Sequence, residues 1–408
     1  MSAALSAAGD LLGWSGAPDP ANELSIVVAG NRLTGWQSIA VTRSVEAFPN
    51  SFSVTAVDQY PYDAGRATAL PGGPGAPCQV FIGNDLVITG YIDQYATAVS
   101  PASHQTTITG RGLCQDLTDC SADLEASSVQ GASLTAANTL DLAQKLCKPF
   151  NIQARLAVDD AGKPIGTFTV ALGETPYEII ERVARYAGYL VYEDAAGDLI
   201  LDRVGTQKMA SGFTMPGNIE AGASALSFNQ RFQKYIVLWS TIAQFNDVSP
   251  LSNHRAEVID ETMPTTRNRP RIIISEQIDP SYDLAQARAN WELARRIGRS
   301  QSISLTCDSW RDSAGRLWKP NALAKIDAPA LKITGAEWII GTVTFRKDSS
   351  GTHADIGLMP PDAFTPQPAP LYLWDRQIMH DLGNPNAAPP TTSGAPQRAA
   401  SNGLLGGV

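Results

Sequence analysis

The chain of 408 residues has few cysteines, few histidines and no long apolar run. Its five cysteines form no CxxC pair and are too few for a disulfide scaffold, and an odd number leaves at least one unpaired. The start of the chain lacks the positive residues of a secretory signal, and no run approaches the ~18 apolar residues of a membrane span. We therefore expect synthesis in a reduced cytoplasm and no stable membrane binding.

Positive charge is also scarce, because 31 Lys and Arg face 40 Asp and Glu, which gives a formal net charge of −9. A protein that wraps a phosphate backbone or adheres to anionic lipid needs a clustered basic surface. The densest basic group, Arg267, Arg269 and Arg271, lies in a polar stretch that is more typical of a solvated loop or a protein interface. The composition argues against tight nucleic-acid binding.

Motifs of the common catalytic and metal sites are missing from the sequence. There is no HExxH and no GxSxG, and the four histidines are isolated from one another. Gly110-Arg111-Gly112 begins like a dinucleotide-binding loop, but Gln115 stands where the third glycine belongs. We expect no catalytic residues, no metal ligands and no cofactor.

Two carboxylate pairs, Asp159-Asp160 and Glu193-Asp194, are the remaining enzymatic lead, since a glycosidase needs two carboxyl groups. Both pairs stand beside turn residues, where acidic side chains are usually solvated or bonded to nearby backbone, and we favour that interpretation.

Eight tryptophans raise the alternative of stacking on sugars. Most lie on apolar strand or helix faces that are typical of a core. Trp310 and Trp318 flank a charged turn, and we expect them to be the most exposed.

The order of apolar patterns predicts a mainly β protein with an α+β segment in its middle. Alternation over Ser51–Val57 is typical of a half-buried strand, and Gly83-Asn84-Asp85 is typical of a hairpin turn. The other strands expected in this first part are Leu24–Ala29, Trp36–Ser44, Gln79–Ile82, Leu86–Ile92 and His104–Thr109.

Two helices are expected in the middle segment. The first is indicated by helical spacing of Leu134, Ala137, Leu140, Ala143 and Cys147. The second begins at the capping box Thr175-Pro176-Tyr177-Glu178 and ends at Gly188, before a hairpin of Tyr189–Glu193 and Asp198–Arg203.

The β pattern returns after about residue 205. The strands expected there are Tyr235–Ser240, an alternating segment at 302–307, Trp338–Phe345 and Thr352–Leu358. Residues 246–300 look like an insertion with one helix. Its expected apolar face consists of Leu284, Ala287, Trp291, Ala294 and Ile297.

One internal echo bears on the domain organisation. Ile88–Ile92 followed by His104–Gly110 is similar to Ile340–Val343 followed by His353–Gly357. With the β, α+β, β order, this echo predicts two related barrels. We expect an N-terminal arm at 1–21, a first tube β-barrel at 22–119, an α+β domain at 120–204, a second tube β-barrel at 205–365 with an insertion at about 246–300, and a flexible C-terminal tail at 366–408.

Five short sequences occur in a fixed order along the chain. They are Gly90-Tyr91-Ile92-Asp93, the stretch from Gly110-Arg111-Gly112 to Asp116 and Ala122, Arg288-Ala289-Asn290-Trp291-Glu292, Gly315-Arg316-Leu317-Trp318-Lys319-Pro320-Asn321, and Leu358–Phe364. Together they resemble the baseplate hub proteins of contractile phage tails, specifically the hub of Mu-like phages. More distantly, the chain is similar to the hub of T4-like phages and to the N-terminal part of type VI secretion spike proteins.

The resemblance implies a structural hub with no catalysis and no cofactor. It implies a homotrimeric ring with pseudo-sixfold symmetry that joins the trimeric tail spike to the hexameric tail tube in the virion baseplate. Other partners implied are wedge proteins, the tape measure protein, and DNA in transit through a channel whose wall we expect to be acidic. The family-signature candidates for structural or interface roles are Gly90, Asp93, Gly110, Arg111, Asp116, Trp291, Trp318, Pro320 and Asn321.

Two alternatives remain open at this point. A tail-tip peptidoglycan hydrolase would use a carboxylate pair, and a carbohydrate-binding receptor protein would use exposed tryptophans such as Trp318.

Overall fold

The structure is a computed structural model that describes residues 20–57, 72–101, 103–123, 133–160, 165–171, 173–205, 207–239, 255–264, 266–275 and 282–367. The expected arm lies outside the described residues except for its last two positions, and the expected C-terminal tail lies outside them except for 366 and 367. Among the described residues, no helix is long and apolar enough to cross a bilayer.

The mainly β fold is confirmed, and its first β unit contains seven strands. They are β1 (Leu24–Val28), β2 (Asn31–Leu33), β3 (Ser38–Ser44), β4 (Ser51–Val57), β5 (Pro77–Ile82), β6 (Asp85–Ser100) and β7 (Ser103–Gly112). Side chains alternate across β4, where Phe52 and Val54 are buried between partly exposed serines and threonine, as the sequence predicts. In space the strands follow the order β2-β1-β5-β6-β7-β4-β3.

A second β unit follows the α+β segment. Its strands are β13 (Gln207–Lys208), β14 (Phe213–Thr214), β15 (Ile219–Leu226), β19 (Gln301–Cys307), β20 (Ala322–Ala328), β21 (Ile333–Asp348) and β22 (Gly351–Met359). Their order is β15-β19-β22-β21, with β20 also beside β21 and with β13 and β14 beside β20. The alternating strand expected at 302–307 is confirmed, because Ile303, Leu305 and Cys307 point into the core.

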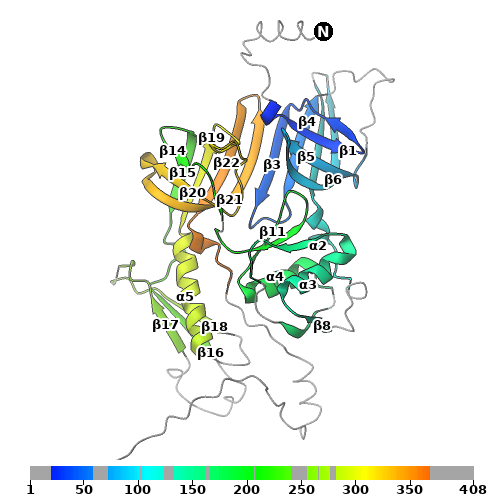
Figure 1. Ribbon diagram of the computed structural model, residues 1–408. Helices are drawn as coiled ribbons and strands as arrows, with labels where there is room; N and C mark the ends of the chain where they lie inside the picture. The colour runs from blue at the N-terminus through cyan, green and yellow to red at the C-terminus, as the bar shows by residue number, and fades with distance from the viewer. Residues whose placement is uncertain are drawn as a thin grey trace, which may run out of the picture. The chain divides into compact units, whose positions relative to one another are not determined.

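The two β units are joined edge to edge into one 14-stranded sheet. The joint is an antiparallel pairing of β21 with β3, in which Thr342 is opposite Ser44 and Lys347 is opposite Ile39. Figure 1 shows the orange strands of the second unit beside the blue strands of the first. One hydrophobic core runs through both units, from Leu24 and Val54 to Phe345 and Leu358.

The segment between the β units is a small α+β unit. Its elements are α2 (Asp116–Asp119), β8 (Ser133–Ala136), α3 (Thr139–Cys147), β9 (Ala154–Leu156), β10 (Gly166–Thr169), α4 (Pro176–Ala187), β11 (Leu190–Glu193) and β12 (Leu199–Asp202). The capping box of α4 is confirmed by the contacts of Thr175 and Glu178, and Gly188 ends the helix with φ 76°. The expected start of the first helix at Leu134 is wrong, because Leu134 lies in β8 and α3 is capped by Asn138.

The insertion contains a sheet as well as a helix, and the first strand of this sheet lies before the expected start of the insertion at about residue 246. Strands β16 (Lys234–Trp239), β17 (Arg255–Ile259) and β18 (Pro270–Ser275) form a three-stranded sheet against α5 (Tyr282–Arg299). The expected apolar face of α5 is wrong at Ala287, which is exposed, whereas Ala285 and Ala289 are buried. These small alanines let the helix approach Val237 and Ala256 closely.

Short 3₁₀ helices complete the described chain: η1 (Pro20–Asn22), η2 (Leu113–Gln115), η3 (Lys148–Phe150), η6 (Pro329–Leu331) and η7 (Pro361–Ala363). Cys114 and Leu117 pack in the core of the α+β unit. We therefore propose that this unit begins near residue 113, a few residues before the expected boundary at 120.

Candidate assembly surface

Two of the candidate residues, Gly90 and Gly110, lie in the paired strands β6 and β7. A Cβ at Gly90 would fall on the backbone oxygen of Arg111, and a Cβ at Gly110 would collide with the backbone of Tyr91 and the ring of Phe52. No side chain fits in either place, so both glycines are required by cross-strand packing.

Asp93 and Arg111 are brought together beside these glycines. Asp93 is the extra residue of a β-bulge between Ile92 and Gln94. Its carboxylate accepts a hydrogen bond of 2.7 Å from Arg111 Nε, and Asp119 accepts two more from the same guanidinium at 2.8 and 3.2 Å. The bonds to Asp119 and Asp93 raise the pKa of Arg111, and burial raises the pKa of the neighbouring Asp116. This cluster clamps the bulge to the start of the α+β unit.

Asn321, by contrast, joins the α+β unit to the second β unit. Its Nδ2 donates to Asp202 Oδ2 at 3.0 Å and to the carbonyl of Arg203 at 2.8 Å, and its Oδ1 accepts from the N–H of Gly205 at 3.0 Å. Pro320 beside it is buried, and the φ of 63° at Asn321 is one that asparagine tolerates better than most residues. The role is structural.

The expectation that Trp310 and Trp318 are exposed is wrong. Both are fully buried, and each indole N–H donates a 2.8 Å hydrogen bond to a backbone carbonyl, that of His353 for Trp310 and that of Ser309 for Trp318. The charged turn between them folds over the rings, since Arg311 reaches out to Asp85 of the first β unit. The charged residues between the two tryptophans therefore cover buried rings and do not indicate that the rings are exposed.

Trp291 stands apart from the other candidates, on α5. Its Nε1 donates to the carbonyl of Thr365 at 2.8 Å, and the guanidinium groups of Arg288 and Arg295 lie over the ring at 4.9 and 5.5 Å from its centroid. It lines a cavity of about 250 Å³ with Tyr177 and Phe364. The candidate residues thus form separate structural contacts.

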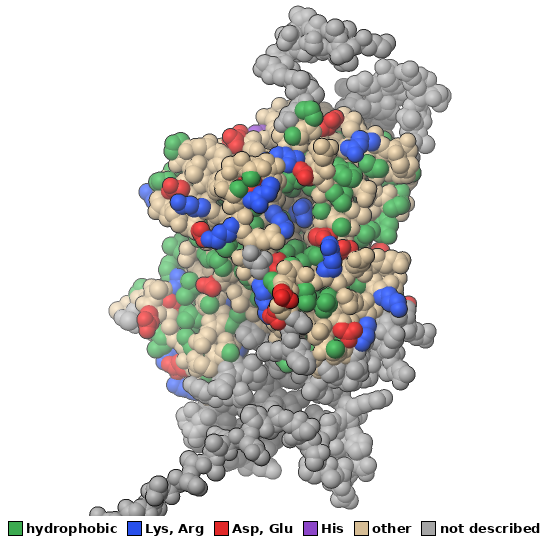
Figure 2. Space-filling model, viewed as in Figure 1, with side chains coloured by type: hydrophobic (Ala, Val, Ile, Leu, Met, Phe, Trp, Pro, Cys, Tyr) green, Lys and Arg blue, Asp and Glu red, His purple; other side chains and the backbone are tan. Residues whose placement is uncertain are grey.

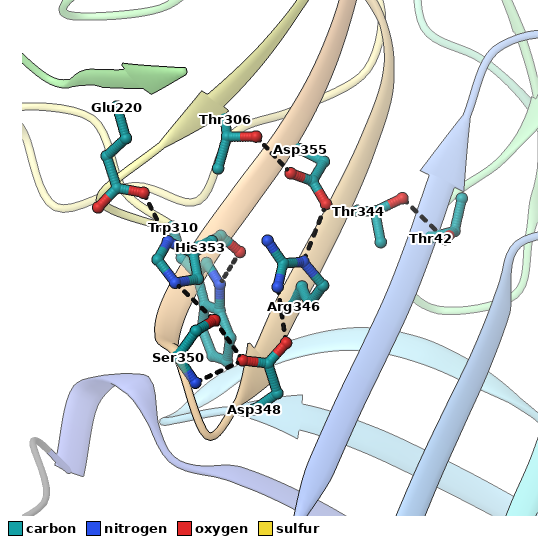
Figure 3. A network of polar contacts seen from close by, with 10 residues as sticks. All are labelled: Thr42, Glu220, Thr306, Trp310, Thr344, Arg346, Asp348, Ser350, His353 and Asp355. Carbon is teal, nitrogen blue, oxygen red and sulfur yellow. Dashed lines mark hydrogen bonds and ion pairs between the residues drawn. The ribbon is translucent and has the colours of Figure 1, made fainter. Parts of the chain in front are cut away.

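A ladder of polar contacts crosses the joint between the β units, on the sheet face away from the core (Figure 3). Thr306 donates to Asp355 at 2.9 Å, Arg346 bridges Asp355 and Asp348 at 3.1 and 2.6 Å, and the hydroxyls of Thr344 and Thr42 are 2.9 Å apart. His353 meets Glu220 of β15 at 2.6 Å. Bonds from Ser350 and Arg346 lower the pKa of Asp348 to about 2. Each carboxylate of the ladder has a partner.

The carboxylate pairs do not form an active site of the glycosidase kind. Glu193 is 3% exposed, and its two oxygens accept from the backbone N–H groups of Asn50 and Cys114, so the expectation of a solvated side chain is wrong for this residue. Asp194 points elsewhere, to Arg155, and caps its own turn as expected. Asp160 pairs with Arg203. Among the described residues, no group of His, Cys, Asp and Glu is placed to hold a metal ion.

Two edges of the large sheet that carry exposed apolar side chains have no neighbouring strand within the part of the chain that the structure describes. No strand pairs with the outer side of β6 from Gln94 to Val99, or with the outer side of β15. Tyr95, Val99 and Leu226 lie on these edges and are 40%, 71% and 66% exposed. An open edge that carries apolar side chains is a template for pairing with another chain. None of these residues is predicted from the sequence as a contact residue, although alternation of Tyr95, Thr97 and Val99 indicates a strand that extends beyond the predicted end at Ile92.

Family models match the first β unit, the α+β unit and the end of the described chain from α5 onward. Family models match at residues 23–112 (Mu phage baseplate assembly protein GpP-like, N-terminal), 114–203 (baseplate hub protein gp44-like, second domain) and 281–367 (Mu phage baseplate assembly protein GpP, fourth domain). The chain is 30% identical over 356 residues to the baseplate hub protein gp44 of Escherichia phage Mu, which covers 84% of this chain and 89% of that protein.

Two solved structures share the fold. The 43 kDa tail protein of prophage MuSo2 from Shewanella oneidensis is 28% identical, with a TM-score of 0.73, over 84% of this chain and 99% of that chain. An E. coli component of the type VI secretion system, described as similar to the T4 tail proteins gp27 and gp5, shares the fold at a TM-score of 0.51 and 10% identity, over 85% of this chain and 80% of that chain.

Proposed function

Because the chain belongs to the family of baseplate hub proteins of Mu-like phage tails, we propose that it forms a homotrimeric ring that joins the trimeric spike to the hexameric tail tube. Its place is the tail baseplate of the virion. The proposed partners are the spike, tail tube, wedge and tape measure proteins, and the proposed role is structural, with no reaction catalysed.

The observation that carries this proposal is a duplication within the sheet. The strands β5-β6-β7-β4-β3 are neighbours in that order, and β20-β21-β22-β19-β15 repeat the same order and directions. Three copies of a chain with two such units present six similar units. A ring of this kind offers threefold symmetry to a spike and near-sixfold symmetry to a tube.

The same ring would surround a channel for the genome, and the sheet face away from the core is the wall we propose for it. That face carries small uncharged side chains, among them Thr42, Ser53 and Thr107, and its carboxylates are paired in the ladder. Figure 2 shows charges of both signs interspersed on the face in view, without a large area of one sign. In place of the acidic wall first expected, we propose a wall rich in hydroxyls on which Arg346 is already paired with Asp348 and Asp355, so that phosphate is held only weakly.

Mass photometry of the full chain, alone and with its cognate spike protein, tests the proposal. We expect a species of three times the 43.4 kDa chain mass under at least one of the two conditions. A monomer under both conditions would overturn the trimeric hub.

The alternatives need separate tests. A zymogram of the purified chain on cell wall tests the tail-tip hydrolase, and a glycan array tests the receptor protein. We expect no clearing and no binding, and a positive result in either assay would favour the corresponding alternative.

A further inference from the structure

We propose that the open edge of β6 pairs antiparallel with the open edge of β15 of a second copy of this chain, with Tyr95 directly opposite the partner subunit's Leu226. The inference rests on the proposed trimer and adds the strands, the direction and the register of its contact.

The chain contains its own template for this contact. Strands β6 and β21 each have 16 residues, and each has a bulge seven residues before its hairpin end, at Asp93 and at Gly341. In both strands the first half pairs with a short preceding strand, β5 or β20, and the second half, from Gly90 or Ile339 onward, pairs with the following strand, β7 or β22. The two hairpins are therefore equivalent position by position.

This equivalence corrects the echo seen in the sequence. The bulge of β21 at Gly341 corresponds to Asp93, not to Gly90, because strand pairing rather than residue type sets the alignment. The duplication predicted from the echo is present, and the glycine correspondence is wrong.

The two hairpins differ in one respect. The second half of β21, from Thr342 to Lys347, pairs with β3, whereas the equivalent part of β6, from Gln94 to Val99, has no strand beside it in the described chain. The strand equivalent to β3 is β15, since β3 pairs with β4 as β15 pairs with β19. Each of the two edges that pair at the joint within the chain therefore has an equivalent that lacks a partner in the described chain, the second half of β6 and the outer side of β15.

The register follows from the template. Val41 of β3 is opposite Phe52, and the equivalent pair in the second unit is Ser224 opposite Ile303. Thr344 is equivalent to Ala96, and Thr42 is equivalent to Ala225. The pair of Thr344 with Thr42 therefore predicts that Ala96 is opposite the partner subunit's Ala225. The neighbouring pairs are Tyr95 with the partner's Leu226, Thr97 with the partner's Ser224, Ala98 with the partner's Ala223 and Val99 with the partner's Gly222.

The side chains fit this register. Of the six large hydrophobic residues that are exposed in the described chain, Tyr95, Val99 and Leu226 lie on these edges. The pairing sets Tyr95 against Leu226 on the core side of the sheet, an aromatic–aliphatic cross-strand pair that stabilises antiparallel strands. On the other side, alanine meets alanine.

Charge also favours the contact. The segments 94–99 and 222–227 contain no charged residue at all. Proteins usually protect an exposed edge with a lysine, a proline or an inward charge, and neither segment has one. Both edges are built to be covered, and each copy offers one of each kind, so the contact propagates from copy to copy until a ring closes.

Paired cysteines test the register in the full chain, in a Cys120→Ser background because Cys120 is the exposed cysteine. Ala96→Cys with Ala225→Cys should give disulfide-linked dimers and trimers on a non-reducing gel, since directly opposite residues lie within the Cα range of a disulfide. The matched off-register control is Ala96→Cys with Ala221→Cys. The equivalent template pair, Thr344→Cys with Thr42→Cys, should close within one chain.

The outcomes separate the two proposals. Cross-links from the off-register pair alone would overturn the register. A trimer by mass photometry without cross-links from the Ala96–Ala225 pair would overturn the strand pairing and leave the hub trimer standing. Monomers without cross-links, in the presence of the spike, would overturn both.

A charge exchange provides a second measurement at Tyr95 and Leu226, whose side chains are exposed in the single chain. Leu226→Lys should weaken assembly at least tenfold, because it buries an unpaired ammonium group, and Tyr95→Glu should do the same. The two changes combined should restore most of the loss. Failure of the combined variant to assemble better than either single variant would contradict the direct opposition of Tyr95 and Leu226.

Discussion

The carboxylate of Glu193 accepts a 2.9 Å hydrogen bond from the backbone N–H of Cys114. Its other oxygen accepts from the N–H of Asn50 at 2.9 Å, and the Asn50 amide donates back to the Glu193 carbonyl at 3.1 Å. Glu193 ends β11 and Cys114 lies at the start of the α+β unit, whereas Asn50 directly precedes β4 of the first β unit. One buried side chain thus holds the α+β unit against the first β unit.

The first prediction concerns the pH dependence of stability. Burial raises the pKa of Glu193 to about 7, from 4.5, against the lowering effect of its backbone hydrogen bonds. The folded state therefore holds this proton more firmly than the unfolded state, and its contribution to stability is complete below pH 4.5 and lost as the pH rises through 7. We expect the free energy of unfolding to fall by up to about 3 kcal/mol between pH 5 and 8.5. Urea denaturation at several pH values checks this, and a flat profile would contradict it.

The second prediction uses Glu193→Gln. Glutamine has one acceptor oxygen for two backbone N–H groups, so one of them loses its partner, at a cost of about 1–3 kcal/mol at pH 5.5. The slope with pH should disappear in this variant. Glu337→Gln is the matched control, because Glu337 forms only an exposed ion pair with Lys208 and its loss should cost less than about 1 kcal/mol. Equal losses in the free energy of unfolding for the two variants would contradict a stabilising role of the Glu193 hydrogen bonds.

Local signals predicted much of the fold. The alternation in β4 and β19, the capping box of α4 and the hairpin at residue 83 depend on neighbours in sequence, and each is confirmed. Gly197 after Glu193 indicates a solvated turn, but the partner of Glu193 is Asn50, 143 positions away. The prediction of exposure for Trp310 and Trp318 is wrong for the same reason, since Arg311 in the turn between them binds Asp85. Sequence spacing does not record such distant contacts.

The candidate assembly surface was the least predictable part. Family-signature residues such as Gly90 and Asn321 explain how the chain is held together, and their predicted interface role remains a prediction. The residues proposed for subunit contact, Tyr95 and Leu226, are ordinary strand residues whose exposure follows from the missing neighbour of each strand. Only the pairing pattern of the whole sheet distinguishes them.

A third prediction concerns the signature glycines. Gly90→Ala and Gly110→Ala each insert a methyl group into occupied space, against a backbone oxygen in both cases, and should destabilise the first β unit by at least about 2 kcal/mol. Gly73→Ala is the control, because nothing lies within 4 Å of a Cβ at that position. Thermal denaturation compares the three variants. Similar melting temperatures for all of them would refute the packing role of Gly90 and Gly110.

A fourth prediction separates a core tryptophan from a sugar-binding one. Trp318 is fully buried against Phe213, with ring centroids 4.5 Å apart. Trp318→Ala should therefore cost about 3–5 kcal/mol of stability, with no glycan binding to lose. Trp318→Phe, which keeps most of the ring contact and loses the hydrogen bond to Ser309, should cost clearly less. A folded, fully stable Trp318→Ala variant would contradict this account.

The last prediction concerns the buried ion pair of the insertion. Arg231 and Asp260 are 2.6 Å apart with side chains 5% and 0% exposed, and hydrogen bonds from Thr262 and Arg231 lower the pKa of Asp260 against the raising effect of burial. Asp260→Asn leaves an unpaired buried guanidinium, which costs about 3–5 kcal/mol, whereas Arg231→Met with Asp260→Leu removes both charges and should cost less. The insertion has its own hydrophobic cluster around Val237 and Ala289, so the loss should be local. Hydrogen exchange should then speed up in β16, β17 and α5 of Asp260→Asn and stay unchanged in β4 and β21. Uniform acceleration through the large sheet would instead make the insertion part of one cooperative unit with it.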